Sequence, residues 1–158
     1  MTGEYYEVEV GGEPIVVEYP DKGETGGIST CMGVGILNNQ LKKGYLGHYI
    51  SFDTDSESLV NKAVSEAKNI GDLEVALVGN IPLSEENTKF TEDNFENVLE
   101  NYREHGKWAL EMVKSKGINI KNIKNLLKKN PCEDSYEIFI DTELGIMEVE
   151  KEEFEELE

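Results

Sequence analysis

The sequence predicts an α/β fold of one domain, in which mixed or antiparallel β-sheets pack in layers with helices. Three observations predict it. Short runs of β-branched and aromatic residues stand at both ends of the chain, and two amphipathic helical patterns lie in its middle. The length of 158 residues suits one domain. A chain of this length buries roughly 70% of its unfolded surface, so it can form a sizeable core.

The first third of the chain predicts four strands between turns rich in glycine and proline. They are expected at residues 4–10, 14–19, 31–37 and 44–52. Residues 20–27 begin with a proline and contain three glycines, so we expect a loop there. The polar residues 38–43 separate the last two strands, which therefore form the clearest hairpin in the chain.

The middle of the chain predicts two helices on either side of an apolar strand. The first helix is expected at residues 55–69, where the apolar residues form one helical stripe: Leu59, Val60, Ala63, Val64 and Ala67. Residues 73–78 read as a strand, and residues 81–91 read as a polar loop. Thr91 is a suitable cap for a long second helix that reaches about Lys116 and ends at Gly117.

The last third is less regular. Residues 118–127 are compatible with a strand or a helix, while residues 136–140 and 146–149 predict a final hairpin. Neither an internal repeat nor a linker divides the chain. We therefore expect residues 1–150 to form the domain and residues 151–158 to form an acidic tail.

Acidic residues dominate the charge. The chain has 33 Asp and Glu against 15 Lys and Arg, which gives a net charge of −18. Such a surface repels phosphate groups, which argues against nucleic acid and against an anionic membrane as partners. No apolar run approaches the ~20 residues of a spanning helix, and the N-terminus does not resemble a signal peptide. These features predict a cytoplasmic protein without membrane insertion.

Cysteine and histidine are scarce. Cys31 and Cys132 are too few for a disulfide framework, so both thiols are expected to be free. A closed zinc site would need both cysteines together with His48 and His105, at spacings unlike those of zinc-binding folds. We therefore expect no metal site.

The predicted hairpin brings a thiol close to an imidazole. A turn centred between Asn39 and Gln40 would place Cys31 opposite His48, with Cβ atoms ~5 Å apart. An imidazole can take the proton of a thiol and stabilise the thiolate, which is the minimum for a cysteine nucleophile. A cysteine on a strand is more often a small buried hydrophobe, so spacing alone leaves both roles open. The two strands also carry glycines that leave room for another backbone or a substrate, at positions 33, 35, 44 and 47.

The residues around Cys31 resemble a known family. The run TGGISTCMGV at residues 25–34 is similar to the motif of the CheD family of chemoreceptor glutamine deamidases. In that motif a threonine, a glycine, an aliphatic residue, two small residues and the catalytic cysteine follow one another in this order. The run GYLGHYI at residues 44–50 resembles the family's histidine segment. The central apolar strand, the long helix and the final hairpin also occur in the family's order.

The resemblance implies a CheD-like layered fold and a site. Cys31 would be the nucleophile, His48 its base, and Thr25 the residue that orients the imidazole. Backbone N–H groups around Ser29 and Thr30 would stabilise the oxyanion. The implied reaction is hydrolysis of a protein glutamine side-chain amide to glutamate through a thioester on Cys31, without a metal or an organic cofactor.

The partner is the part of this interpretation that the residues leave open. The resemblance implies a methyl-accepting chemotaxis receptor as the protein substrate. A second possibility keeps the cysteine and histidine but changes the substrate protein, or transfers the acyl group to an amine as a transglutaminase does. A third is a non-enzymatic protein of CheD fold that regulates a chemotaxis partner such as a CheC-type phosphatase.

Overall fold

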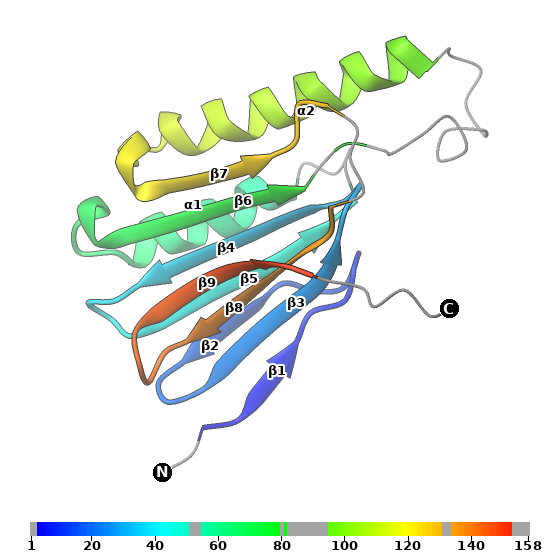
Figure 1. Ribbon diagram of the computed structural model, residues 1–158. Coiled ribbons are helices and arrows are strands. Elements are labelled where there is room, and N and C mark those ends of the chain that lie inside the picture. The colour runs from blue at the N-terminus through cyan, green and yellow to red at the C-terminus, as the bar shows by residue number, and fades with distance from the viewer. Residues whose placement is uncertain (1–2, 51–54, 80, 82–94, 131–133, 153–158) are drawn as a thin grey trace, which may run out of the picture.

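The computed structural model describes residues 3–50, 55–79, 81, 95–130 and 134–152. These residues form two α-helices and nine strands in two mixed sheets, which confirms the predicted α/β class (Figure 1). The larger sheet has the strand order β2-β5-β4-β6-β7, and the smaller has the order β1-β3-β8-β9. The strands are β1 (Tyr5–Glu7), β2 (Ile15–Glu18), β3 (Lys22–Ile28), β4 (Met32–Asn38), β5 (Lys43–Tyr49), β6 (Leu73–Gly79), β7 (Ile123–Leu127), β8 (Tyr136–Asp141) and β9 (Ile146–Lys151). The helices are α1 (Ser56–Glu66) and α2 (Phe95–Ser115).

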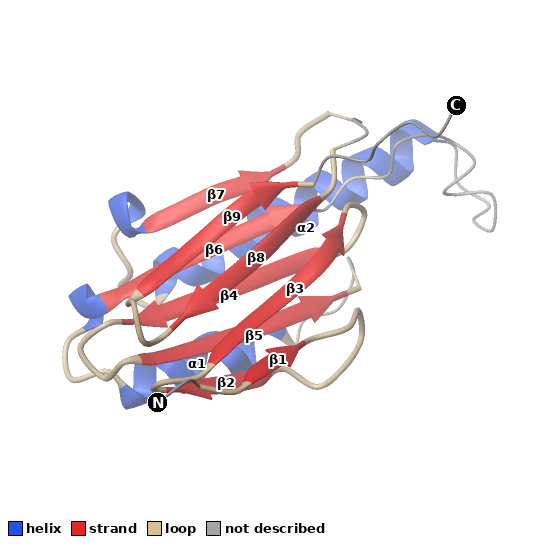
Figure 2. Cartoon of the chain, turned by 60° about the horizontal axis from the view of Figure 1, so that its bottom comes forward, coloured by secondary structure: helices blue, strands red, loops and turns tan. Residues whose placement is uncertain are grey.

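The five-stranded sheet is the middle of three layers. Its strands present alternate side chains to its two faces, because successive Cβ atoms of a strand point in opposite directions. On one face, side chains such as Val34 and Ile36 of β4 pack with Leu59 of α1 and Val113 of α2. On the other face, side chains such as Leu37 pack against the four-stranded sheet. Figure 2 shows the helices behind the larger sheet and the smaller sheet in front of it.

Glycines on β4 and β5 determine how closely the two sheets pack. A methyl group added at Gly33 would lie 2.5 Å from Ile28 Cδ1, and one added at Gly44 would lie 2.7 Å from Ile140 Cγ2. The room that these glycines leave is therefore filled by isoleucines of the smaller sheet and not by a substrate. Gly47 faces the other way, and the ring of Tyr49 covers it.

The prediction of a loop at residues 20–27 is wrong, because most of that segment forms β3. β3 pairs in parallel with β1 and antiparallel with β8, so it has hydrogen-bonding neighbours on both sides. That pairing overrides the low strand propensity of its glycines. The register shifts between Thr25 and Ile28, where Gly27 has a φ of +68°, and this bulge ends the regular part of the strand.

The remaining elements follow the predictions with shifted ends. The helix α1 stops at Glu66, and the ambiguous residues 118–127 form a short 3₁₀ turn followed by β7, parallel to β6. Gly117 ends the long helix with a φ of +93°, as expected. The predicted cap Thr91 and most of the loop before it lie outside the described residues, as do residues 153–158 of the expected tail. None of the described helices is long and apolar enough to cross a membrane.

Candidate active site

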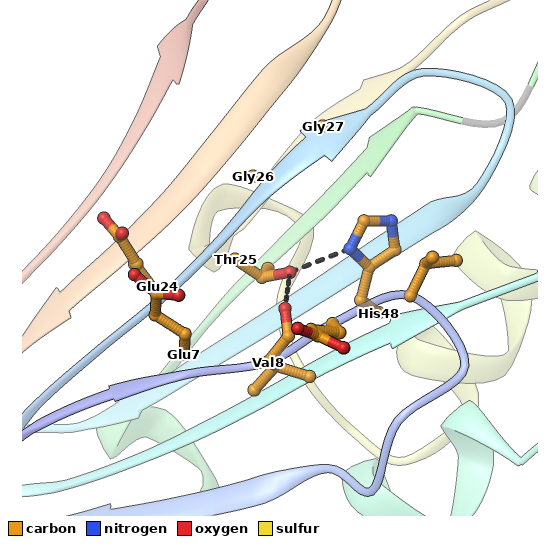
Figure 3. A pocket seen from close by; sticks show the side chains of 9 residues that line it. Glu7, Val8, Glu24, Thr25, Gly26, Gly27 and His48 are labelled. Carbon is orange, nitrogen blue, oxygen red and sulfur yellow. Dashed lines mark hydrogen bonds between the residues drawn. The ribbon is translucent and has the colours of Figure 1, made fainter.

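Two predicted site residues meet between the sheets. β3 supplies Thr25 and β5 supplies His48, and both side chains are almost completely buried, with exposed fractions of 1% and 3%. Oγ1 of Thr25 lies 2.8 Å from Nδ1 of His48 (Figure 3). A backbone hydrogen bond also connects the N-terminal segment to β5, because the N–H of Gly11 donates to the carbonyl of His48.

The hydroxyl of Thr25 determines which nitrogen of His48 carries the proton. Its Oγ1 lies 2.7 Å from the carbonyl oxygen of Val8, which can only accept a hydrogen bond. A hydroxyl has a single proton, so Thr25 donates to Val8 and must accept from Nδ1–H of His48. In the neutral imidazole the lone pair is then on Nε2, which is the position of a general base.

Nε2 of His48 is buried and has no hydrogen-bond partner among the described residues. Burial also lowers the pKa of His48, which keeps the ring neutral and able to accept a proton. The ring lines a pocket of about 470 Å³ between the N-terminal segment and β3. The pocket is formed by Glu7, Val8, Glu9, Val10, Glu24, Thr25, Gly26, Gly27 and His48 (Figure 3).

The register of the hairpin differs from the prediction. His48 pairs with Gly33 and not with Cys31, so the turn is centred one residue further along the chain than expected. Local hydrogen bonding gives the reason, since the side chain of Asn38 accepts from the N–H of Leu41 and Lys42 adopts a φ of 54°. Cys31 precedes Gly33 by two residues and lies outside the paired part of the hairpin.

Cys31 lies just before β4, in the bend that connects it to β3. The thiol is free and partly buried, and burial raises its pKa, while a hydrogen bond with Thr30 acts in the opposite direction. Among the described residues, no hydrogen bond joins Cys31 to His48, and Cys31 does not line the pocket around His48. Both pKa shifts favour the neutral forms, so the thiol and the imidazole rest uncharged.

The remaining predicted positions lie beside the thiol or outside the described residues. Ser29 and Thr30 share the bend with Cys31, and both are partly buried. Cys132 lies outside the described residues. Within the part of the chain that the structure describes, no cluster of three or more His, Cys, Asp or Glu side chains could hold a metal ion.

Two groups at this site were not predicted. The carbonyl of Val8 leaves no signal in the sequence, because any residue could supply it. Gly79 at the end of β6 packs on the backbone of Cys31, where an added methyl group would overlap the Cys31 carbonyl oxygen. Its φ of +100° also favours glycine. A glycine that ends a buried apolar strand was the available signal for a close backbone approach.

Comparisons with known proteins add no assignment. A scan of the chain against models of known protein families finds no match, and a search of the curated proteins finds no significantly similar sequence.

Proposed function

We propose that the chain is a CheD-like deamidase that hydrolyses glutamine side-chain amides of a protein to glutamate, with Cys31 as nucleophile. The observation that carries the proposal is the hydrogen-bond chain from Val8 through Thr25 to His48. This chain leaves Nε2 of His48 as a buried acceptor at a pocket, and the cysteine is two residues from its strand partner. A nucleophile, a base and a third group that orients the base are the parts that acyl transfer by cysteine requires.

In the acylation step, Sγ of Cys31 attacks the amide carbon while Nε2 of His48 takes the thiol proton. A C–S bond forms, and the electron pair of the C=O bond moves to oxygen, where backbone N–H groups near Ser29 and Thr30 stabilise it. The intermediate then collapses: the C–N bond breaks, and the imidazolium gives its proton to the leaving nitrogen. Ammonia departs and a thioester remains.

The second step reverses these roles with water. Nε2 of His48 takes a proton from a water molecule as the water oxygen attacks the thioester carbon. The C–S bond breaks, and the proton returns to the Cys31 sulfur, which leaves a glutamate carboxyl on the substrate. Because both groups rest uncharged, the thiolate forms only during the attack, as Nε2 of His48 takes the thiol proton.

Amide hydrolysis provides the test. Ammonia release and the glutamine-to-glutamate mass change are measured on receptor fragments and on glutamine peptides. We expect Cys31→Ser and His48→Ala to lose at least about 10²-fold in activity, since general base catalysis alone contributes that much. Cys132→Ser is the matched control and should keep the wild-type rate. Wild-type activity in Cys31→Ser would contradict the proposal.

One observation favours a second function, that of a binding protein. Cys31 makes no hydrogen bond to His48 among the described residues, and burial raises the pKa of its thiol. In this alternative the chain binds and regulates a chemotaxis partner such as a CheC-type phosphatase. Binding to the partner would then survive Cys31→Ser, and no substrate glutamine would be converted by the wild type.

A further inference from the structure

The pocket beside His48 is strongly acidic. Three of its nine lining residues are glutamates, Glu7, Glu9 and Glu24, and none is a lysine or an arginine. Figure 3 shows Glu7 and Glu24 on one side of the Thr25–His48 pair. We call this site the acidic pocket. A buried side chain with one unpaired nitrogen also lines it, because His48 is 3% exposed and its Nε2 has no hydrogen-bond partner among the described residues.

Further carboxylates surround the acidic pocket. The N–H of Gly27, on the pocket wall, donates to the carboxylate of Glu152, which follows the last strand. Burial and the charges of Glu24, Glu152 and Glu150 together raise the pKa of Glu137 on the neighbouring strand β8. The like charges around the pocket therefore repel one another, and a bound cation would relieve that repulsion.

We propose that the acidic pocket binds the side chain of an arginine or lysine that lies near the target glutamine in the substrate protein. This inference rests on the proposed function and names the substrate class of the same site. An anionic residue would be repelled there, and an uncharged one would gain nothing from the three carboxylates. A guanidinium is the best match, because its planar fork of donors can pair with carboxylates in a bidentate manner.

Paired peptides test the inference without a known substrate. Each pair contains one glutamine and differs only at one nearby position, which holds arginine or its uncharged isostere citrulline. We expect the wild type to release ammonia from the best arginine peptide with about a 10-fold higher kcat/KM, which corresponds to about 1.4 kcal/mol. Added salt should reduce that ratio, because Glu7 and Glu9 are exposed and Glu24 is half-buried.

Two triple variants with the same change in net charge locate the effect. In the combined variant Glu7→Gln, Glu9→Gln and Glu24→Gln, the ratio should fall to about one, because the carboxylates that pair with the guanidinium are gone. The control variant Glu74→Gln, Glu96→Gln and Glu143→Gln changes three exposed residues outside the pocket and should keep the wild-type ratio. Circular dichroism of both variants confirms that they fold.

The outcomes separate this inference from the proposed function. If the wild type hydrolyses arginine and citrulline peptides equally at every position, the acidic pocket does not select a cation, although the deamidase assignment stands. If no peptide is hydrolysed, the deamidase assignment fails. Fluorescence anisotropy then measures binding of the same peptides to Cys31→Ala, which tests whether the acidic pocket selects a cationic side chain. Tighter binding of the arginine peptides supports the inference, and equal or absent binding overturns it.

Discussion

Thr25 is the residue on which the protonation pattern of His48 depends. Its hydroxyl connects the carbonyl of Val8 to Nδ1 of His48, and the direction of both hydrogen bonds follows from the single hydroxyl proton. A side chain of the same shape without a hydroxyl would leave the His48 ring in the same place. It would no longer favour the tautomer that is protonated at Nδ1. Position and protonation can therefore be separated at this residue.

We predict that Thr25→Val lowers kcat for the proposed amide hydrolysis by about 10²-fold, because His48, the proposed general base, loses the group that keeps its lone pair on Nε2. Thr25→Ser keeps a hydroxyl and should retain most of the activity. The imidazole ¹⁵N shifts of His48 provide a readout independent of activity, measured in a His105→Gln background that leaves one histidine. Wild type and Thr25→Ser should show the Nδ1–H form, and an unchanged spectrum in Thr25→Val would contradict the argument.

Cys31 provides a second prediction, about pH. Burial raises the pKa of its thiol, so less thiolate is present at neutral pH than for a free cysteine. In a Cys132→Ser background, the rate of alkylation by iodoacetamide should therefore reach half its maximum above the ordinary thiol pKa of about 8.5. Thr30→Val removes a hydrogen bond that lowers this pKa and should move the midpoint higher still. In the protein that keeps Thr30, an alkylation midpoint below about pH 8.5 would contradict this prediction and would indicate a preformed ion pair between Cys31 and His48.

At the scale of elements, the end of β6 packs against the bend that carries Cys31, the proposed nucleophile. We predict that Gly79→Ala abolishes most of the amide hydrolysis, because the new methyl group overlaps the Cys31 carbonyl and displaces that backbone. The substitution should also destabilise the fold by about 1–2 kcal/mol or more, because alanine is disfavoured at a φ of +100°. Urea unfolding and ammonia release measure the two effects separately.

Gly117→Ala is the matched control for Gly79→Ala. Gly117 has a similar φ of +93°, yet its added methyl group would lie 3.4 Å from Ile70 Cδ1, an ordinary contact. It should therefore show the backbone penalty with activity intact. Equal losses of activity in the two variants would mean that stability, and not the position of Cys31, limits catalysis.

The elements also show what could be predicted from the sequence. Alternating and β-branched residues predicted the hairpin of β4 and β5, because one face of each strand is buried. The same reasoning missed β3, whose glycines predict a loop and whose pairing with β8 depends on residues more than a hundred positions away. It also misplaced the turn, because an Asn38 side-chain hydrogen bond and the positive φ of Lys42 set the register.

The candidate site divides in the same way. Side-chain chemistry and the family resemblance pointed to Thr25 and His48, which the fold brings together through strands of different sheets. The direct opposition of Cys31 and His48 was wrong, because it depended on the register. The Val8 carbonyl and the acidic wall of the pocket could not be predicted, because both require the N-terminal segment to lie beside β3.

For the whole molecule, net charge opposes the packing of the three layers. The sequence has 33 acidic side chains against 15 basic ones, so most carboxylates have no lysine or arginine of their own to pair with. A net charge of −18 means that folding brings like charges together. Exposed ion pairs contribute little to the free energy of unfolding. Added salt should therefore change that free energy more by screening the repulsion between carboxylates than by weakening the ion pairs.

We therefore predict that NaCl stabilises the fold. Raising its concentration from ~0.01 to ~0.1 M shortens the screening length from about 30 to about 10 Å, which removes most long-range repulsion between carboxylates. The unfolding temperature in scanning calorimetry should rise by a few degrees, since about 1 kcal/mol corresponds to about 2–4 °C at this chain length. The exposed triple variant Glu74→Gln, Glu96→Gln and Glu143→Gln should have a higher unfolding temperature than the wild type in low salt. Its unfolding temperature should also rise less when NaCl is added. A flat or falling unfolding temperature would mean that specific ion pairs, and not overall repulsion, dominate the electrostatics of this acidic protein.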